Sequence, residues 1–193
     1  MVIGPSALKR RWTSGASMIE VLVTMVIIAF GLLGMVGLQV RLQASELESY
    51  QRSQALLLLN DMVSRMTTNR KNVASYLTPP TSPVGANLTT CPSTITTVAQ
   101  RDLGEWCELL KGAGETTDSG TVKVGAMIGG RGCVEATGSD YLVTVAWQGQ
   151  TPVSAPPSSV ACGANAYDGA TGSACVSDRC RRVVTTLVRI ATL

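Results

Sequence analysis

An unbroken apolar segment near the N-terminus dominates the hydropathy pattern of the chain. From Val21 to Leu38 the eighteen residues VLVTMVIIAFGLLGMVGL carry no charge, and Thr24 supplies their only polar side chain. A helix of this length extends roughly 27 Å, close to the thickness of the hydrocarbon core of a bilayer. A cleaved secretory signal has a shorter apolar core and ends at small residues, and nothing of this kind follows Leu38. The pattern predicts a transmembrane helix segment over residues 16–40.

The helical pattern continues beyond the apolar segment. Residues 39–77 contain neither glycine nor proline. Four apolar residues in this stretch recur at the spacing of one helix face: Leu59, Met62, Val63 and Met66. Pro79 and Pro80 stop the pattern, because the residue before a proline avoids helical geometry. We predict an amphipathic continuation over residues 41–77, as part of one helix from about Ala16 to about Tyr76.

The rest of the chain, residues 78–193, predicts a globular region with a sheet. Residues 78–120 are rich in Thr, Ser, Pro and Gly and predict loops with one short helix near residues 101–111. Three later segments have strand signals: Thr121–Met127, Tyr141–Trp147 and Arg182–Ile190. The connections between them need no helix, which favours an antiparallel sheet. The expected fold class is α+β, with the amphipathic half of the helix packed on the sheet.

The charges orient the chain across a membrane. The formal net charge is +3, and residues 1–15 contain three basic residues, Lys9, Arg10 and Arg11, just before the apolar segment. Basic residues flanking a membrane helix stay in the cytoplasm, so residues 1–15 are expected to be a cytoplasmic leader and the C-terminal region periplasmic. The remaining chain has 13 basic and 13 acidic residues and few aromatics. This balance argues against a nucleic-acid partner.

Six cysteines lie downstream of the apolar segment, on the side expected to be exported: Cys91, Cys107, Cys133, Cys162, Cys175 and Cys180. An even number in an oxidising compartment favours disulfides, and fifteen complete pairings are open. No two cysteines have the C-x-x-C spacing of a redox centre or a zinc site, so disulfides are favoured over metal or redox chemistry.

The residue composition disfavours an enzyme. Histidine is absent, which removes the commonest general base and the commonest metal ligand. A Ser–Lys pair is conceivable with one of three lysines, but no motif supports it: Lys71, Lys111 and Lys123. Glu105 and Glu108 fit a solvated helix face better than a pair of catalytic carboxylates. We therefore expect no catalytic residue, no cofactor and no metal.

Two other patterns suit structural roles. The glycine-rich stretch Gly129–Gly132 lacks the spacing of a phosphate-binding loop and predicts a tight turn. The arginines around Cys180, Arg179, Arg181 and Arg182, are too few for a nucleic-acid surface. An exposed strand end or a contact between subunits is the simpler interpretation.

Glu20 lies directly before the apolar segment, at the expected membrane boundary. Ionisable groups at this depth are costly and usually functional. One interpretation is a boundary residue whose side chain reaches back to water. The other requires a cation: a cut after Gly15 would free the α-amino group of Ala16, which could pair with Glu20 of a neighbouring subunit during packing.

The stretch GASMIEVLVTMVIIAFGLLGMVGLQ resembles the class III signal of type IV prepilins, which combines a short basic leader, a glycine at the cut and a glutamate five residues later. The continuation FGLLGMVGLQ is most similar to the type IV pilus modification proteins, the PilV group. The stretches YLVTVAWQG and CRRVVTTLVRI are also similar to that group. The resemblance covers about the first 45 residues and these two stretches, whereas residues 78–120 and 150–175 resemble nothing in it.

The resemblance implies a type IV pilin fold and specific roles for three residues. Gly15 would precede the cut made by a prepilin peptidase, Ala16 would become the N-methylated mature end, and Glu20 would dock the subunit into a filament. Most of the family begins its mature chain with a bulky apolar residue such as Phe, whereas this chain has Ala16, which puts methylation in question. Gly31, Gly34 and Gly37 either form a packing surface for other helices or are simply tolerated in a membrane helix.

The function implied is that of a minor pilin in the bacterial inner membrane, with its N-terminus cytoplasmic, that reaches the pilus after assembly. It would prime pilus assembly from the tip together with other minor pilins and the major pilin. Its further partners would be the prepilin peptidase, the inner-membrane assembly platform and membrane lipid. A pseudopilin of a type II secretion system is the nearest alternative. A membrane-tethered periplasmic adhesin or binding module is another, and it would need neither Glu20 nor a cut after Gly15.

Overall fold

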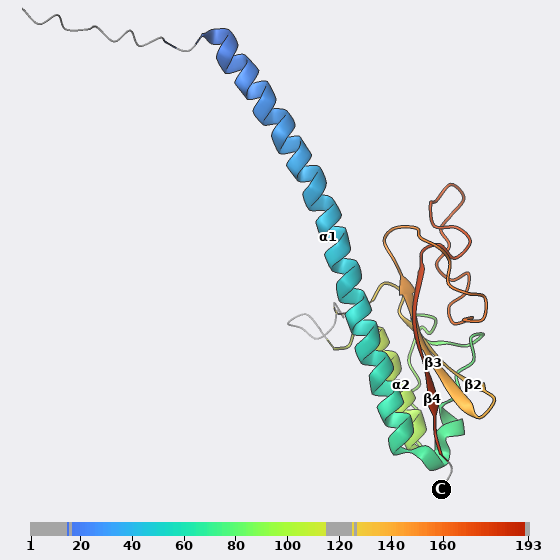
Figure 1. Ribbon diagram of the computed structural model, residues 1–193. Helices are drawn as coiled ribbons and strands as arrows, with labels where there is room; N and C mark the ends of the chain where they lie inside the picture. Colours follow the sequence, from blue (N-terminus) through green and yellow to red (C-terminus); the bar gives the residue numbers. More distant parts are fainter. Residues whose placement is uncertain (1–14, 16, 115–124, 126, 192–193) are drawn as a thin grey trace, which may run out of the picture. The chain divides into compact units, whose positions relative to one another are not determined.

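Seven helices and strands follow one another in the described part of the chain, which comprises residues 15, 17–114, 125 and 127–191 of a computed structural model. In chain order they are α1 (Met18–Thr68), η1 (Arg70–Tyr76), β1 (Val84–Gly85), α2 (Val98–Leu110), β2 (Arg131–Thr137), β3 (Asp140–Gln148) and β4 (Arg181–Arg189) (Figure 1). The chain divides into two units, residues 1–43 and 44–193. Helix α1 contributes residues to both, and each unit is described by itself below.

Helix α1 is shorter than the sequence pattern predicted. It ends at Thr68, and a 3₁₀ helix, η1, occupies residues up to Tyr76, with Asn72 outside helical geometry at φ −117° and ψ 26°. Polar side chains at this end compete for hydrogen bonds: the Thr68 hydroxyl donates to the Ser64 carbonyl at 2.8 Å, and the Asn72 amide donates to Asn69 Oδ1 at 2.9 Å. Such local bonds favour helix ends over helix interiors, so the prediction of one helix to Tyr76 was wrong.

The sheet has the order β1-β2-β3-β4, and every neighbouring pair is antiparallel. A two-residue turn joins β2 to β3, and its first residue is Gly138 at φ +63°, a conformation that glycine adopts without strain. Strands β3 and β4 confirm the predictions over residues 141–147 and 182–190 to within one residue. Strands β1 and β2 were not predicted.

The strand predicted over residues 121–127 falls mostly outside the described residues, and its two described positions, 125 and 127, belong to no strand. A turn lies just after it, at residues 127–130, where the Gly130 N–H donates to the Met127 carbonyl at 3.2 Å. The tight turn predicted for residues 129–132 is therefore present only at its first two glycines, because Arg131 and Gly132 belong to β2.

The core lies between one face of the sheet and two helices. Helix α1 buries a stripe of apolar residues at helical spacing: Ala55, Leu59, Met62 and Met66. They pack with the inward-facing valines of β2 and β3, Val134, Val143 and Val145. Helix α2 packs beside α1, over β1 and β2 (Figure 1). The coarse prediction of an α+β layout, with the second part of a long helix on an antiparallel sheet, is confirmed.

Trp106 of α2 joins the two helices to the sheet. Its indole is fully buried, and its Nε1–H donates to the Leu58 carbonyl of α1 at 2.9 Å. The ring lies directly over Gly132 of β2, where a Cβ atom would come within 2.2 Å of it. Glycine is therefore required at this position for the close approach of the helix.

Helix α2 begins at Val98, a few residues before the predicted start near Arg101. Thr97 caps it, because its hydroxyl accepts from the Gln100 N–H at 3.2 Å while the Gln100 side chain accepts from the Thr97 N–H at 3.2 Å. This reciprocal arrangement satisfies two free donors at the helix start. A disulfide from Cys91 to Cys107 ties the preceding loop to the helix.

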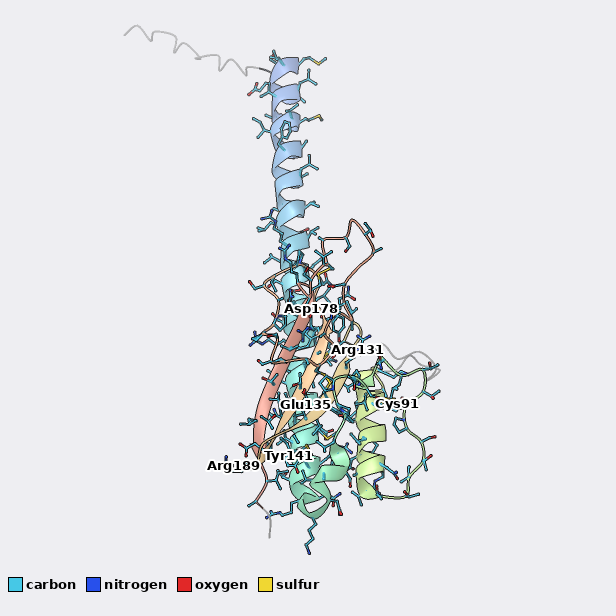
Figure 2. All side chains as sticks on the ribbon, turned by 90° about the vertical axis from the view of Figure 1, so that its right-hand side faces the viewer. Cys91, Arg131, Glu135, Tyr141, Asp178 and Arg189 are labelled. Carbon is cyan, nitrogen blue, oxygen red and sulfur yellow. A yellow bond between two sulfur atoms is a disulfide. The ribbon has the colours of Figure 1, made fainter. Side chains whose placement is uncertain are left out.

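The other face of the sheet is covered at one end by the long connection between β3 and β4. A disulfide joins Cys162 of this connection to Cys133 of β2. Tyr167 lies under the Arg131 guanidinium, 4.8 Å from ring centroid to Cζ, and its hydroxyl donates to the Gly129 carbonyl at 2.9 Å. Figure 2 labels Arg131 and Asp178 toward this end of the sheet, and Tyr141 and Arg189 toward the other.

Candidate functional site at the N-terminal helix

The first unit presents an exposed helix surface that is apolar all round from Val21 to Leu38. Every residue from Met18 to Gln43 is exposed, and the apolar side chains among them include Met18 at 85 %, Phe30 at 72 % and Leu33 at 67 % exposure. The helix is long and apolar enough, by length and composition, to cross a membrane. No burial within the chain accounts for this surface in the part that the structure describes.

The helix satisfies its own polar groups along the apolar segment. Its backbone groups are bonded within the helix, which is the condition for a segment that leaves water. The Thr24 hydroxyl donates to the Val21 carbonyl at 2.9 Å, so the only polar side chain of the eighteen-residue run is also paired. The segment can therefore enter lipid or a helix bundle without an unpaired polar group.

Glu20 lies in the first turn of α1. Its N–H donates to the Ser17 carbonyl at 2.9 Å, and the Val21 N–H donates to the same oxygen at 3.2 Å. The carboxylate is exposed, and within the described residues it has no side-chain partner. The positive end of the helix dipole favours an acidic residue at this position. Within the described part of the chain, the Glu20 carboxylate is therefore available to a cation.

The positions around the expected cut are only partly described. Gly15 is exposed, and a Cβ built on it would meet no atom within 4 Å. Ala16, the expected mature end, lies outside the described residues. Cleavage and methylation here remain predictions.

Three glycines interrupt the apolar surface of the same helix. A Cβ at Gly31, Gly34 or Gly37 would meet nothing within 4 Å, so no contact in the chain requires glycine at these positions. Their role is open between a surface for close helix packing and simple tolerance.

The second unit pairs all six cysteines. The disulfides are Cys91–Cys107, Cys133–Cys162 and Cys175–Cys180, and no cysteine is free. The sequence had left the pairing open. Among the described residues no group of three or more His, Cys, Asp or Glu side chains could hold a metal ion.

The carboxylates of α2 take part in an ion-pair network that sequence reasoning missed. Arg65 of α1 binds Glu105 at 2.6 Å, Asp61 at 2.9 Å and Asp102 at 3.2 Å. Burial alone would lower the pKa of Arg65, but the hydrogen bonds and charges of Glu105 and Asp61 raise it. Tyr76 donates to Asp102, and burial together with this bond raises the pKa of Tyr76 to about 12. The four-residue spacing of Asp61 and Arg65 was the one available signal.

Beside this network lies an open groove of about 620 Å³ between the Cys91–Ile95 segment and α2. Its lining mixes apolar side chains, such as Ile95 and Leu109, with the charged side chains of Arg101, Glu105 and Glu108. Glu105 is already paired with Arg65, which favours the structural interpretation of the α2 carboxylates over a catalytic one.

The arginines near Cys180 have separate tasks. The guanidinium of Arg181 is buried and donates to the Val160 and Cys162 carbonyls at 2.6 and 3.1 Å, and it pairs with Asp178. Arg182 pairs with Glu48 of α1 and donates to the Thr151 carbonyl. Only Arg179 is exposed. These residues do not form a common site.

Comparisons with protein-family models, curated proteins and solved structures find nothing that matches this chain. The exposed apolar helix with one carboxylate at its start is the feature of the chain that bears most directly on its function.

Proposed function

We propose that the chain is a minor pilin of the type IV pilus, related to the PilV group, and that it acts in assembly and not in catalysis. One observation carries the proposal: from Met18 to Val40 the helix surface is exposed and apolar, and Glu20 is its only charged residue. A helix that is apolar all round is stable where lipid or other helices, and not water, surround it. Its acidic start needs a cation that the described residues do not supply.

The proposed mechanism follows from the cost of a charge in lipid. A prepilin peptidase would cut after Gly15, which frees the α-amino group of Ala16. In a filament, that cation on one subunit would pair with the Glu20 carboxylate on the next. Since an unpaired carboxylate in an apolar helix bundle is costly, the pairing would favour subunits in register. The apolar surface from Val21 to Leu38 would then pass from lipid into the packed helices of the filament.

The periplasmic side of the proposal rests on the second unit. Three disulfides fit an exported, oxidising compartment. A long helix on an antiparallel sheet is the layout that a pilin fold requires. In this proposal the protein sits in the inner membrane with its N-terminus cytoplasmic. It associates there with other minor pilins, the major pilin and the assembly platform, and uses no cofactor.

The first test is the N-terminal residue and mass of the protein from membranes that contain an active prepilin peptidase. A mature end at Ala16, with or without a methyl group, is expected. An intact Met1 would overturn the processing step and favour a tethered binding module. A Gly15→Val variant, which should remain uncut, is the matched control.

A second measurement addresses docking. Glu20→Gln retains the size of the side chain but removes its charge, and it should be processed normally yet fail to enter filaments or a complex with other minor pilins. Wild-type incorporation of this variant would contradict the proposed role of Glu20. Co-purification of the processed chain with secretion components, and not with pilus components, would favour the pseudopilin alternative.

A further inference from the structure

The outer edge of β4 has main-chain groups without a partner. The two-residue turn at Gly138 makes Thr137 and Asp140 a hydrogen-bonded pair, so even-numbered residues of β3 bond to β2 and odd-numbered residues bond to β4. The β4 partners of those odd residues are even-numbered: 182, 184, 186 and 188. The N–H and C=O groups of Val183, Thr185 and Leu187 therefore point away from the sheet, and no described residue bonds to them.

We propose that this edge binds an extended segment of another protein as a fifth strand, antiparallel to β4. Edge strands are usually protected by proline, by a bulge or by charged side chains. Strand β4 has none of these between residues 183 and 188. Main-chain bonds to such an edge supply affinity, and the side chains beside it supply selectivity.

Apolar side chains lie on both sides of the edge. Leu187 is 58 % exposed on the sheet face opposite α1, next to exposed Thr185. On the α1 side, Leu56 is 43 % exposed. Successive residues of a helix are about 100° apart, so Leu56 and Arg65 lie on opposite sides of the buried Ala55. Arg65 is on the side that binds α2. Since α2 covers β1 and β2, Leu56 lies toward β4. An added strand would bury Leu56 and Leu187 with its alternate side chains.

The opposite edge of the sheet is protected. Strand β1 has only two residues, and one isolated bridge from Thr78 to Val134 extends the pairing of β2. Three prolines lie between that bridge and β1: Pro79, Pro80 and Pro83. Proline lacks the N–H that a further strand would need. The two edges thus differ, and only β4 offers continuous pairing.

Unpaired positive charge lies near the start of β4. Arg179 is exposed three residues before Arg182, and Arg52 is exposed one helical turn after Glu48, which pairs with Arg182. Within the described residues neither Arg52 nor Arg179 has a carboxylate partner. A segment with apolar and hydroxyl side chains followed by carboxylates at its C-terminal end would place those carboxylates beside the two arginines.

A second copy of this chain does not fit the edge. Pairing two β4 strands antiparallel would also place residues 44–68 of the two copies antiparallel, because Glu48 lies at the start of β4 and α1 runs with it. Two subunits anchored in one membrane run the same way. For the antiparallel pairing proposed here, a copy running the same way would have to offer its β1 edge, which the prolines protect. This exclusion rests on the anchoring proposed above, whereas the free edge does not.

The test uses the full-length, disulfide-bonded chain in detergent and a fluorescein-labelled peptide. In the peptide, threonine and valine alternate over six residues and two aspartates follow. Fluorescence anisotropy should detect binding, and a peptide with lysines in place of the aspartates should bind at least about fivefold more weakly. Hydrogen exchange should show that the peptide protects the amides of Val183, Thr185 and Leu187, whereas those of Val184 and Thr186 are protected throughout.

Two pairs of variants decide the outcome. Thr185→Pro removes an outward N–H without removing a bond to β3, and it should weaken binding about tenfold or more while near-ultraviolet circular dichroism stays native. Leu56→Lys should also weaken binding, whereas Leu57→Lys, at a side chain that is 70 % exposed on another face of α1, should not. Undiminished binding to Thr185→Pro, or no protection of the three amides, would overturn the proposal. So would disulfide-linked dimers of Thr185→Cys. An intact Met1 would overturn the proposed function but would not count against strand binding at β4.

Discussion

The two parts of α1 meet the same requirement, the removal of apolar surface from water, in opposite ways. Residues 18–43 are exposed throughout, and from Val21 to Leu38 the helix is apolar on every side. Residues 44–68 bury one stripe at helical spacing, Gln51, Ala55, Leu59, Met62 and Met66, and expose the rest. A stripe needs one partner, and the sheet of the same chain provides it. An apolar surface all round cannot be covered by one sheet, and no described residue of the chain buries it.

The largest effect that tests this contrast is the difference between two aromatic substitutions, one in each part of the chain. Trp106→Ala should lower the free energy of unfolding by about 3–5 kcal/mol, because it empties the contact between Leu58 and Gly132. Phe30→Ala removes an aromatic ring of the exposed part and should change it by less than about 0.5 kcal/mol. Urea unfolding of the full chain in detergent, followed by far-ultraviolet circular dichroism, measures both. Equal losses would show that the first part of α1 is also packed within the chain.

Removal of disulfides should affect only the second unit, by amounts that follow the enclosed length. Replacing Cys133 and Cys162 with serine opens the longest loop, at a sequence separation of 29, and should cost about 3–4 kcal/mol. The same change at Cys175 and Cys180, at a separation of 5, should cost about 2 kcal/mol. Thermal unfolding gives the ranking. The helical content of residues 18–43 in detergent should not change in either variant, and a loss there would argue against independent units.

The smallest effect concerns Glu135, on the sheet face opposite the helices. Its Oε1 atom is buried, and within the described part of the chain it has no hydrogen-bond partner. Burial raises the pKa of this carboxyl. A protonated carboxyl tolerates burial better than a carboxylate does. The stability associated with Glu135 is therefore fully present below the ordinary pKa of a glutamate, and it is lost as the pH rises through the raised pKa of the folded state. Glu135→Gln should stabilise the protein at pH 7, by less than about 1 kcal/mol, and give no gain near pH 4.

The measurement for Glu135 is chemical unfolding at both pH values. Arg189→Ala is a contrasting variant, since Arg189 binds Asp140 at 2.7 Å and the hydrogen bond holds the pKa of Asp140 below its ordinary value. This contribution is present at neutral pH and lost in acid, the opposite sign to that of Glu135. A gain for Glu135→Gln that is the same at both pH values would contradict the explanation by burial.

Periodicity in the sequence predicted the elements whose side chains alternate strongly. The long apolar run follows from its length and lack of charge, whereas the amphipathic stripe and strands β3 and β4 follow from patterns of 3.6 and 2 residues. Strand β2 was missed because its first residues, RGC, offer little apolar alternation: Gly132 is required by Trp106, and Cys133 is in a disulfide. Both constraints come from distant parts of the chain. The end of α1 was missed because Asn69 and Asn72 bond to each other in place of the helix backbone.

The candidate site was almost entirely open to prediction, since it consists of local features. Glu20, the basic residues before it and the apolar run lie close together in the chain, and residues 18–43 are exposed. Non-local features could not be predicted. The Arg65 network joins residues up to 40 positions apart, and the pairing of six cysteines depends on how the sheet brings them together.

The disulfides have a consequence for a chain under tension. A pulling force can lengthen only those residues that no cross-link encloses. Between Cys133 and Cys180 the bonds Cys133–Cys162 and Cys175–Cys180 enclose every residue except those from 163 to 174. When fully extended, that stretch spans roughly 45 Å. Strand β3 lies inside the first enclosed loop, so a pull along the chain that unravels the sheet adds no length from β3 until a disulfide is reduced.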